Sequence, residues 1–218
     1  MVTFDKCVQD PAAWKPFWRN IGLYPLKCAG QRSRQRDTNL LNLALMHEDI
    51  QAALYHQASK LAVQISQEGL SQEQSRASLA YLTHYTTIEQ AHANFLRATL
   101  EYMGVPAVKP CAVEHPGNLG STLKSLMQFL ADIKRQVTGA YRGIARHLGN
   151  LGVVQLMASL YSAEVHQAWE IQELTGSSQE PPQTYQTPTE SIVSLQKFLA
   201  ETPKGRAAER VFGILCPG

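Results

Sequence analysis

The stretch Glu89-Gln90-Ala91-His92 is the most informative feature of this chain, because it sets a carboxylate and an imidazole three residues apart in a long helical pattern. Residues with this spacing share one face of a helix, and here that face is also the apolar one. Glu48 interrupts the apolar face of the preceding helical segment in the same way. Burying a charge in a helical core is unfavourable unless the charge is paired or binds a metal. The quartet therefore predicts a bundle with a polar layer inside, for which a metal ion is the most economical partner.

Four long segments repeat apolar residues with the 3.6-residue period of an amphipathic helix. We expect helices over residues 38–66, 72–103, 121–148 and 152–174. Asp37 is the expected N-cap of the first helix, and Ser71 with Gln74 forms a capping-box pattern before the second. Gly104 followed by Pro106 marks the end of the second helix.

The lengths of the connections predict the topology. Short turns near Gly69 and Gly149 should fold each pair of neighbouring helices into an antiparallel hairpin. The seventeen residues of 104–120 reach up to ~55 Å when extended. A helix of about thirty residues is ~45 Å long, so this connection can cross the whole bundle. Two hairpins joined by one long crossover predict an all-α, ferritin-like four-helix bundle.

Three parts follow along the chain. We expect an N-terminal arm over residues 1–36, the bundle over 37–175, and a loop over 176–218 that carries short helices near 191–200 and 207–215. The basic run Gln31–Arg36 is interpreted as a solvated linker, because the formal net charge is only +2 and nucleic acid is not an expected partner. No apolar run reaches the ~18 residues of a membrane span.

The cysteines leave the cellular compartment open. None of them forms a CxxC pair, so a zinc knuckle is not expected. The four cysteines are Cys7, Cys28, Cys111 and Cys216. They are either idle thiols or, in an oxidising compartment, they form two disulfides. The first residues lack the pattern of a secretion signal, which favours the cytoplasm, whereas export stays open if a signal precedes this sequence.

The apolar rows of the four segments are interrupted at one level each. Measured from a turn at residue 70, Glu48 lies 22 positions before it and His92 lies 22 after it. Measured from a turn at residue 150, Lys134 lies 16 positions before it and Glu164 lies 14 after it. Members of a hairpin at equal distances from the turn meet at one height. The topology is further expected to bring the two hairpins to the same height, so these residues should form one shared polar site.

The sequence resembles a known family at this point. LLNLALMHEDIQAALY, residues 40–55, is similar to the first helix of ferritin-like proteins of the desiccation-related kind. EQAHANFLRA, residues 89–98, is similar to the second helix of that family. The resemblance covers about residues 37–98 well and 121–174 loosely. It implies that Glu48, Glu89 and His92 are ligands from the first half of a di-iron or di-manganese centre.

The second half departs from the family pattern. Lys134 stands at the level where the family has a glutamate. Glu164 is followed three positions later by Gln167 rather than by a histidine. His166 would face the core only in an alternative register, which leaves Ala163 at the place of the glutamate. The second half-site is therefore degenerate in either register.

Charge counting favours a single ion. Three carboxylates opposed by the Lys134 ammonium leave a charge of about −2, which one divalent ion would balance. Iron or manganese suits such ligands, as does zinc, with metal ligands drawn from Glu48, Glu89, His92, Glu164 and, in the other register, His166. Lys134 would take the place of the second metal. The alternative is a metal-free cluster, in which Lys134 pairs directly with two of the glutamates.

Two functions stay open on this sequence. One is an oxygen-dependent oxidoreductase, in which Lys134 stabilises a reduced oxygen species by its charge and Tyr85 takes part in catalysis. Three more tyrosines lie near the site by helical spacing, either for redox chemistry or for packing, and they are Tyr55, Tyr141 and Tyr161. The other function is a metal-free scaffold that binds a partner under stress. A homodimer is compatible with both, and the sequence names neither a small-molecule nor a protein partner.

Overall fold

The computed structural model describes residues 31–109, 120–176, 186 and 190. These residues form four α-helices and contain no β-strand. The helices are α3 (Gln31–Ala62), α4 (Gln72–Tyr102), α5 (Leu123–His147) and α6 (Leu151–Thr175). The expected C-terminal helices near 191–200 and 207–215 lie outside the described residues, as do all four cysteines.

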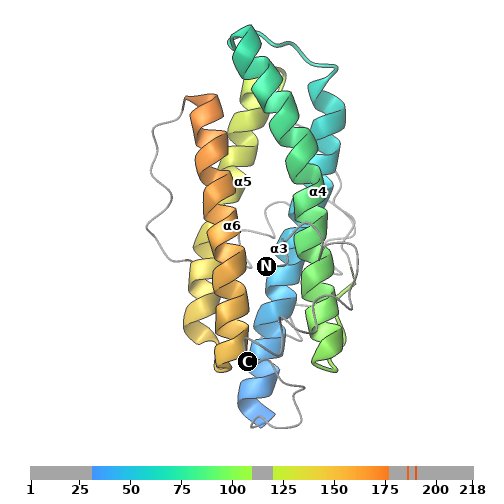
Figure 1. The fold of residues 1–218 in the computed structure, drawn as a ribbon, viewed down its shortest axis with the longest axis vertical. Helices are drawn as coiled ribbons and strands as arrows, with labels where there is room; N and C mark the ends of the chain where they lie inside the picture. Colours follow the sequence, from blue (N-terminus) through green and yellow to red (C-terminus); the bar gives the residue numbers. More distant parts are fainter. Residues whose placement is uncertain (1–30, 110–119, 177–185, 187–189, 191–218) are drawn as a thin grey trace, which may run out of the picture.

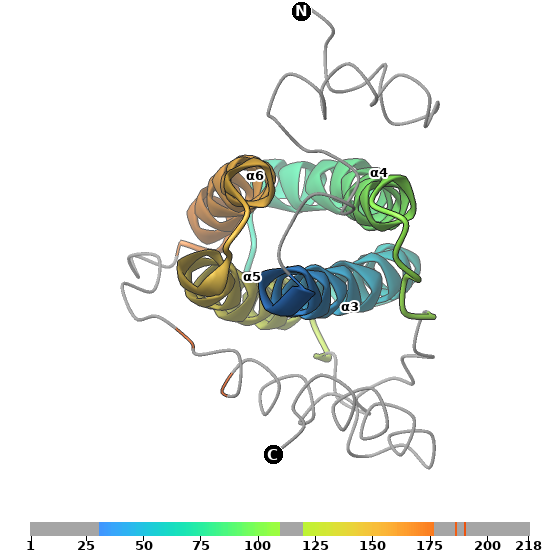
Figure 2. The same ribbon diagram turned by 90° about the horizontal axis from the view of Figure 1, so that it is seen from below.

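The helices pack as two hairpins side by side (Figures 1 and 2). The most extensive contacts join α3 to α4 and α5 to α6, and the next most extensive join α3 to α5. Seen along the bundle, α3 and α5 lie beside each other on one side and α4 and α6 on the other (Figure 2). This arrangement confirms the predicted all-α four-helix bundle.

The ends of the long connection lie at opposite ends of α3. Asn42, near the start of α3, hydrogen bonds to the carbonyl of Pro106 at 3.4 Å and accepts from the amide of Val108 at 2.8 Å. Beyond the other end of α3, the carbonyl of Ser66 accepts from the amide of Leu123 at 2.8 Å. The chain therefore has to travel the length of the bundle between α4 and α5, as its length predicts, and α4 and α5 run in the same direction (Figure 1).

The expected bounds of α4 are confirmed, because its start and stop signals are local. The hydroxyl of Ser71 accepts from the amide of Gln74 at 3.1 Å, and the Gln74 side chain accepts from the amide of Ser71 at 2.9 Å. Gly104 follows the helix with a φ of +72°, a conformation that glycine adopts without a Cβ clash.

The expected start of α3 is wrong. The helix begins at Gln31, so the basic run Gln31–Arg36 is helical rather than a linker. Glutamine and arginine have high helix propensity, but they do not extend the apolar period that predicts the start of this helix at residue 38. Asp37 is not an N-cap either: its buried carboxylate accepts from the backbone amides of Gly149 and Asn150, at 2.8 Å each. It therefore ties the start of α3 to the turn between α5 and α6.

The expected end of α3, at residue 66, is also too late. The helix stops at Ala62, and the amides of Gln64 and Ile65 both donate to the carbonyl of Leu61. Ser66 instead forms an isolated β-bridge with Thr122 just before α5. A contact that is distant in sequence therefore ends this helix.

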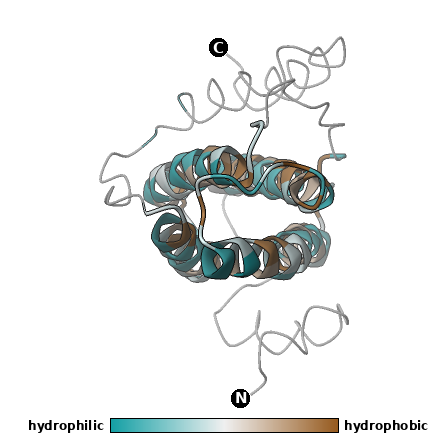
Figure 3. Cartoon of the chain, turned by 90° about the horizontal axis from the view of Figure 1, so that it is seen from above, coloured by the Kyte–Doolittle hydropathy of each residue, from teal (hydrophilic) through white to brown (hydrophobic). Residues whose placement is uncertain are grey.

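Each helix carries both hydrophilic and hydrophobic residues, as expected of amphipathic helices around one core (Figure 3). Large aliphatic side chains that are fully buried fill the interior above and below the polar level, among them Leu41, Leu45, Leu82, Leu96, Leu130 and Leu160. None of the helices in the described part of the chain is long and apolar enough to cross a membrane.

Candidate metal centre

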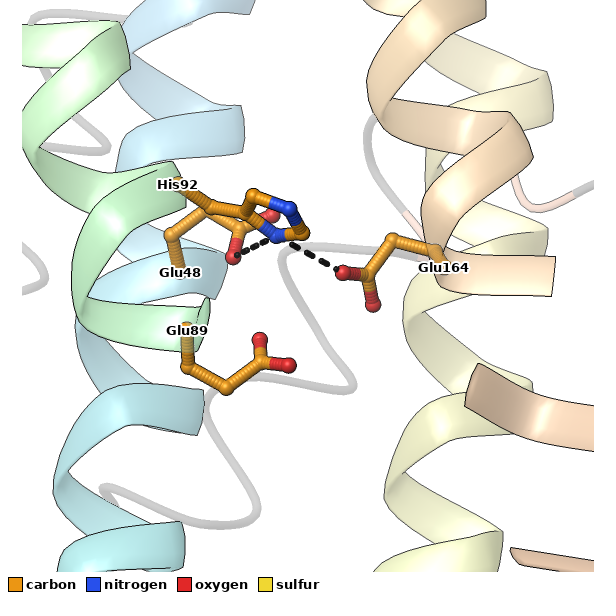
Figure 4. Close-up of side chains that lie close together, drawn as sticks. All are labelled: Glu48, Glu89, His92 and Glu164. Carbon is orange, nitrogen blue, oxygen red and sulfur yellow. Dashed lines mark hydrogen bonds and ion pairs between the residues drawn. The ribbon is translucent and has the colours of Figure 1, made fainter. Parts of the chain in front are cut away.

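One polar layer interrupts this core. Glu48 comes from α3, Glu89 and His92 from α4, and Glu164 from α6, and all four are fully buried (Figure 4). Each offers one ligand atom, and these atoms lie within 4.8 Å of one another. Carboxylate and imidazole groups brought this close are the ligands that iron, manganese and zinc accept.

Lys134 enters the same layer from α5 and is also fully buried. Its Nζ lies 2.7 Å from Glu89 Oε1 and 2.7 Å from Glu164 Oε2. Burial acts to lower the pKa of Lys134, but the charges of Glu164 and Glu89 outweigh it and raise that pKa. The ammonium therefore stays charged and bridges two carboxylates of different helices.

His92 links the other pair of carboxylates. Its Nδ1 lies 3.1 Å from Glu164 Oε1 and 3.5 Å from Glu48 Oε2, the two contacts drawn in Figure 4. Burial acts to lower the pKa of His92, but the charge of Glu48 and the hydrogen bonds to Glu164 and Glu48 raise it to about 10. The imidazole is therefore protonated near neutral pH when only protein groups surround it.

Two further side chains hold Glu48. The Tyr141 hydroxyl, from α5, donates to Oε1 of Glu48, and Gln51 donates to Oε2 at 3.5 Å. The ring of His47 packs edge-on against Tyr141, with the ring centroids 6.3 Å apart. Burial lowers the pKa of His47 to about 4, so this neighbouring imidazole stays neutral.

Glu89 and Glu164 have opposite protonation behaviour although Lys134 touches both. Burial, followed by the charge of Glu164, raises the pKa of Glu89 to about 8 despite the opposing effect of Lys134. Burial also acts to raise the pKa of Glu164, but Lys134 and the hydrogen bond from His92 lower it overall. Of these two carboxylates, Glu89 is therefore the one that carries a proton more readily.

If Glu48 and Glu164 are counted as carboxylates and His92 and Lys134 as cations, the cluster is neutral without a metal when Glu89 carries a proton. A divalent ion would reach the same balance if it replaced the protons of Glu89 and His92. Metal ligands must be deprotonated, so binding an ion here would release about two protons.

The structure places the predicted residues as follows. It brings together Glu48, Glu89, His92, Glu164 and Lys134, in the register that faces Glu164 inward. The side chain of His166 is 74% exposed and lies 3.8 Å from Glu170, so it is outside the layer and is removed from the candidate ligands. The hydroxyl of Tyr85 donates to Glu170.

Gln167 occupies the position three residues after Glu164 and is buried, with the oxygen of its side-chain amide lacking a hydrogen-bond partner within the described residues. Three residues after its glutamate, α6 therefore carries the amide of Gln167, whereas α4 carries the imidazole of His92.

The sequence interpretation missed Tyr81 and Gln51. Tyr81 is buried, and its hydroxyl lies 3.2 Å from that of Tyr55 and donates to the carbonyl of Gln167 at 3.1 Å. Helical spacing could have indicated both residues, because Tyr81 lies four positions before Tyr85 and Gln51 three after Glu48.

Comparison with protein families agrees with the four-helix fold. The model described as "Ferritin-like domain" matches residues 36–177, which is most of the chain. The chain therefore belongs to the ferritin-like domain family. Searches of curated proteins and of solved structures returned no match.

Proposed function

We propose that this chain binds one divalent metal ion in the buried layer and is a ferritin-like protein of the desiccation-related kind. The observation that carries the proposal is the set of four ligand atoms, from Glu48, Glu89, His92 and Glu164, within 4.8 Å of one another in a fully buried layer. The donors come from three helices, so side chains distant in sequence converge on one point.

The donor set fits a metal in a second respect. Glu89 Oε2 is buried and has no hydrogen-bond partner among the described residues, although the other oxygen of this carboxylate is bonded to Lys134. Leaving a buried polar oxygen unsatisfied, whether or not it carries the proton of Glu89, costs about 1–3 kcal/mol. An ion coordinated by Glu89 would remove that cost.

Lys134 supports one ion rather than two. The ammonium already lies 2.7 Å from both Glu89 and Glu164, which is where a second cation would have to lie to share these carboxylates. Placing another divalent ion beside it would bring like charges together in a low-dielectric interior. The resemblance implies two ions in intact family members, so this half-site is degenerate in our proposal.

The chemistry we propose is oxygen-dependent oxidation or reduction. A bound iron or manganese ion would supply a redox couple and an open coordination position. Lys134 keeps a fixed positive charge in the layer, where it would stabilise a negatively charged oxygen species. Tyr141 holds the Glu48 carboxylate in one orientation by its hydrogen bond. The surrounding aliphatic side chains exclude bulk water from all of these groups.

Metal analysis of the purified chain tests the proposal. After expression with added iron or manganese, we expect about one ion per chain, and we expect His92→Ala to lose it. His84→Ala is the matched control, because His84 lies on the same helix but is exposed. Unchanged metal content in His92→Ala would refute the ligand assignment, and far-UV circular dichroism would establish that the variant is folded.

A second function is favoured by the direct ion pairs of Lys134. Since the layer is neutral and largely hydrogen bonded with protein groups alone, the bundle can also serve as a metal-free scaffold that binds a partner under stress. In that case the segments before α3 and after α6, residues 1–30 and 176–218, would contact the partner. Absence of metal after expression with added iron and manganese would favour this second function.

A further inference from the structure

Three tyrosines form a series of contacts that begins at the polar layer. Tyr55 lies on α3, whereas Tyr81 and Tyr85 lie one turn apart on α4. Tyr55 is fully buried, Tyr81 is 6% exposed and Tyr85 is 7% exposed. Phenylalanine would fill the same volume without a hydroxyl to satisfy, so three phenols in a row inside a core call for a chemical explanation.

The inner end of this series touches the layer. Nζ of Lys134, which is bonded to Glu89 and Glu164, lies 5.4 Å from the centre of the Tyr55 ring. The Tyr55 ring is 6.1 Å from that of Tyr81, and the two hydroxyls are 3.2 Å apart. The first step of the series is therefore a contact between neighbouring side chains.

The outer end reaches a surface carboxylate. The rings of Tyr81 and Tyr85 are 4.3 Å apart, the closest ring contact of the series. The hydroxyl of Tyr85 donates to Oε2 of Glu170, whose side chain is 42% exposed. A carboxylate in direct hydrogen-bond contact can accept the proton of a phenol as its electron leaves.

We propose that Tyr55, Tyr81 and Tyr85 form a one-electron relay between the buried layer and the surface, with Glu170 as the proton acceptor of Tyr85. The relay rests on the proposed function, because its oxidant is a one-electron oxidant formed at the layer from dioxygen or a peroxide. Tyr85 is thereby given a specific role, as the last electron donor of the series.

The step balances in atoms and charge. One electron leaves the phenol of Tyr85 and passes through Tyr81 and Tyr55 to the oxidant, which is reduced by one electron. The O–H bond of Tyr85 breaks, and its proton forms a new O–H bond on Oε2 of Glu170. A neutral tyrosyl radical and a neutral carboxylic acid result, and an external reductant at the surface restores the phenol by one electron while Glu170 returns the proton.

Electron paramagnetic resonance tests the relay. Iron-loaded protein treated with hydrogen peroxide should give a tyrosyl radical signal, and Tyr85→Phe should lose it. Tyr161→Phe is the matched control, because this half-buried tyrosine lies on α6 outside the series, and it should keep the signal. Glu170→Gln keeps an acceptor for the hydrogen bond but not a base, and it should also lose the signal. An unchanged signal in Tyr85→Phe or in Glu170→Gln would overturn the relay.

A second measurement separates failure of the relay from failure of the metal site. The iron content of every sample is determined before peroxide is added. If the chain binds no iron, the proposed metal site fails, and the relay is tested in metal-free protein with a photogenerated ruthenium(III) polypyridyl as the oxidant. A radical that decreases in both Tyr85→Phe and Glu170→Gln, but not in Tyr161→Phe, supports the relay there. Equal yields in all four proteins would overturn it.

Discussion

The two hairpins of the bundle bring opposite chemistry to the same level. The α3–α4 hairpin supplies Glu48, Glu89 and His92, which are all groups that bind metals. The α5–α6 hairpin supplies Glu164 together with Lys134, a cation that cannot be a ligand while it is charged. Groups of opposite charge from two hairpins can therefore meet at one buried level, where Lys134 acts as a counter-ion to the carboxylates.

Replacing Lys134, the cation of the second hairpin, should have the largest effect on stability. Lys134→Met removes the ammonium but keeps most of the volume, and it leaves Glu89 and Glu164 buried without their partner. We expect a loss of about 3–5 kcal/mol in the free energy of unfolding of metal-free protein, measured by urea denaturation. Lys124→Met, on the same helix but half-buried, should change it by less than about 0.5 kcal/mol. Equal losses in the two variants would show that Lys134 does not neutralise the layer.

The pH dependence of stability should distinguish the metal-free from the metal-loaded layer. The pKa of Glu89 is raised from 4.5 to about 8, and that of His92 from 6.5 to about 10. Both groups bind more protons in the folded state, so their contribution is complete below their ordinary pKa values and is lost as pH rises through 8 and 10. Metal-free protein should therefore lose roughly 4 kcal/mol between pH 7 and pH 9, measured by urea denaturation.

Metal-loaded protein should show a flatter profile over the same range, because Glu89 and His92 would already have lost their protons. Identical profiles with and without metal would show that these two residues are not ligands.

Removing the hydroxyl of Tyr141, on the second hairpin, should destabilise the buried Glu48 of the first hairpin. Tyr141→Phe takes away the donor to Glu48 and leaves a buried carboxylate oxygen unsatisfied, which should cost about 1–3 kcal/mol of stability. Thermal unfolding at pH 7 measures the effect, with Tyr161→Phe as the control. A cost confined to metal-free protein would mean that an ion takes over the role of the hydroxyl.

The smallest effects should come from the helix caps, where the two hairpins are alike. Ser71 caps α4 and Thr122 caps α5 through equivalent capping boxes. Replacing either by alanine should cost about 1 kcal/mol and leave the metal content unchanged. Different costs at the two positions, measured by urea denaturation, would show that the hairpins also differ in stability away from the layer.

Sequence reasoning succeeded where the determining contacts are local. The capping box at Ser71 and the positive φ at Gly104 set the bounds of α4, and both signals are readable within a few residues. Helical rise and turn position place Glu48 level with His92 and Lys134 level with Glu164, and the predicted topology brings these two pairs to one height.

It failed where a distant contact decides. Aspartate is a residue type favoured at N-caps, yet the carboxylate of Asp37 accepts hydrogen bonds from the turn of the other hairpin, which no local pattern reveals. His166 is a candidate ligand in the sequence for another reason. It lies about half a turn around the helix from Glu164, and a short apolar pattern does not settle which of the two side chains faces inward. Only the packing of α6 against its neighbours places Glu164 inside and His166 outside.

Hydrogen bonds join α3 to the α5–α6 hairpin at both of its ends, through Asp37 at one end and through Ser66 just beyond the other. Glu48 sits between these two anchors, so its height relative to Lys134 is set by contacts outside the layer rather than by the side chains within it. A cation of different radius would therefore have to be accommodated by rotation about side-chain bonds, because axial sliding of one hairpin past the other is blocked at both ends.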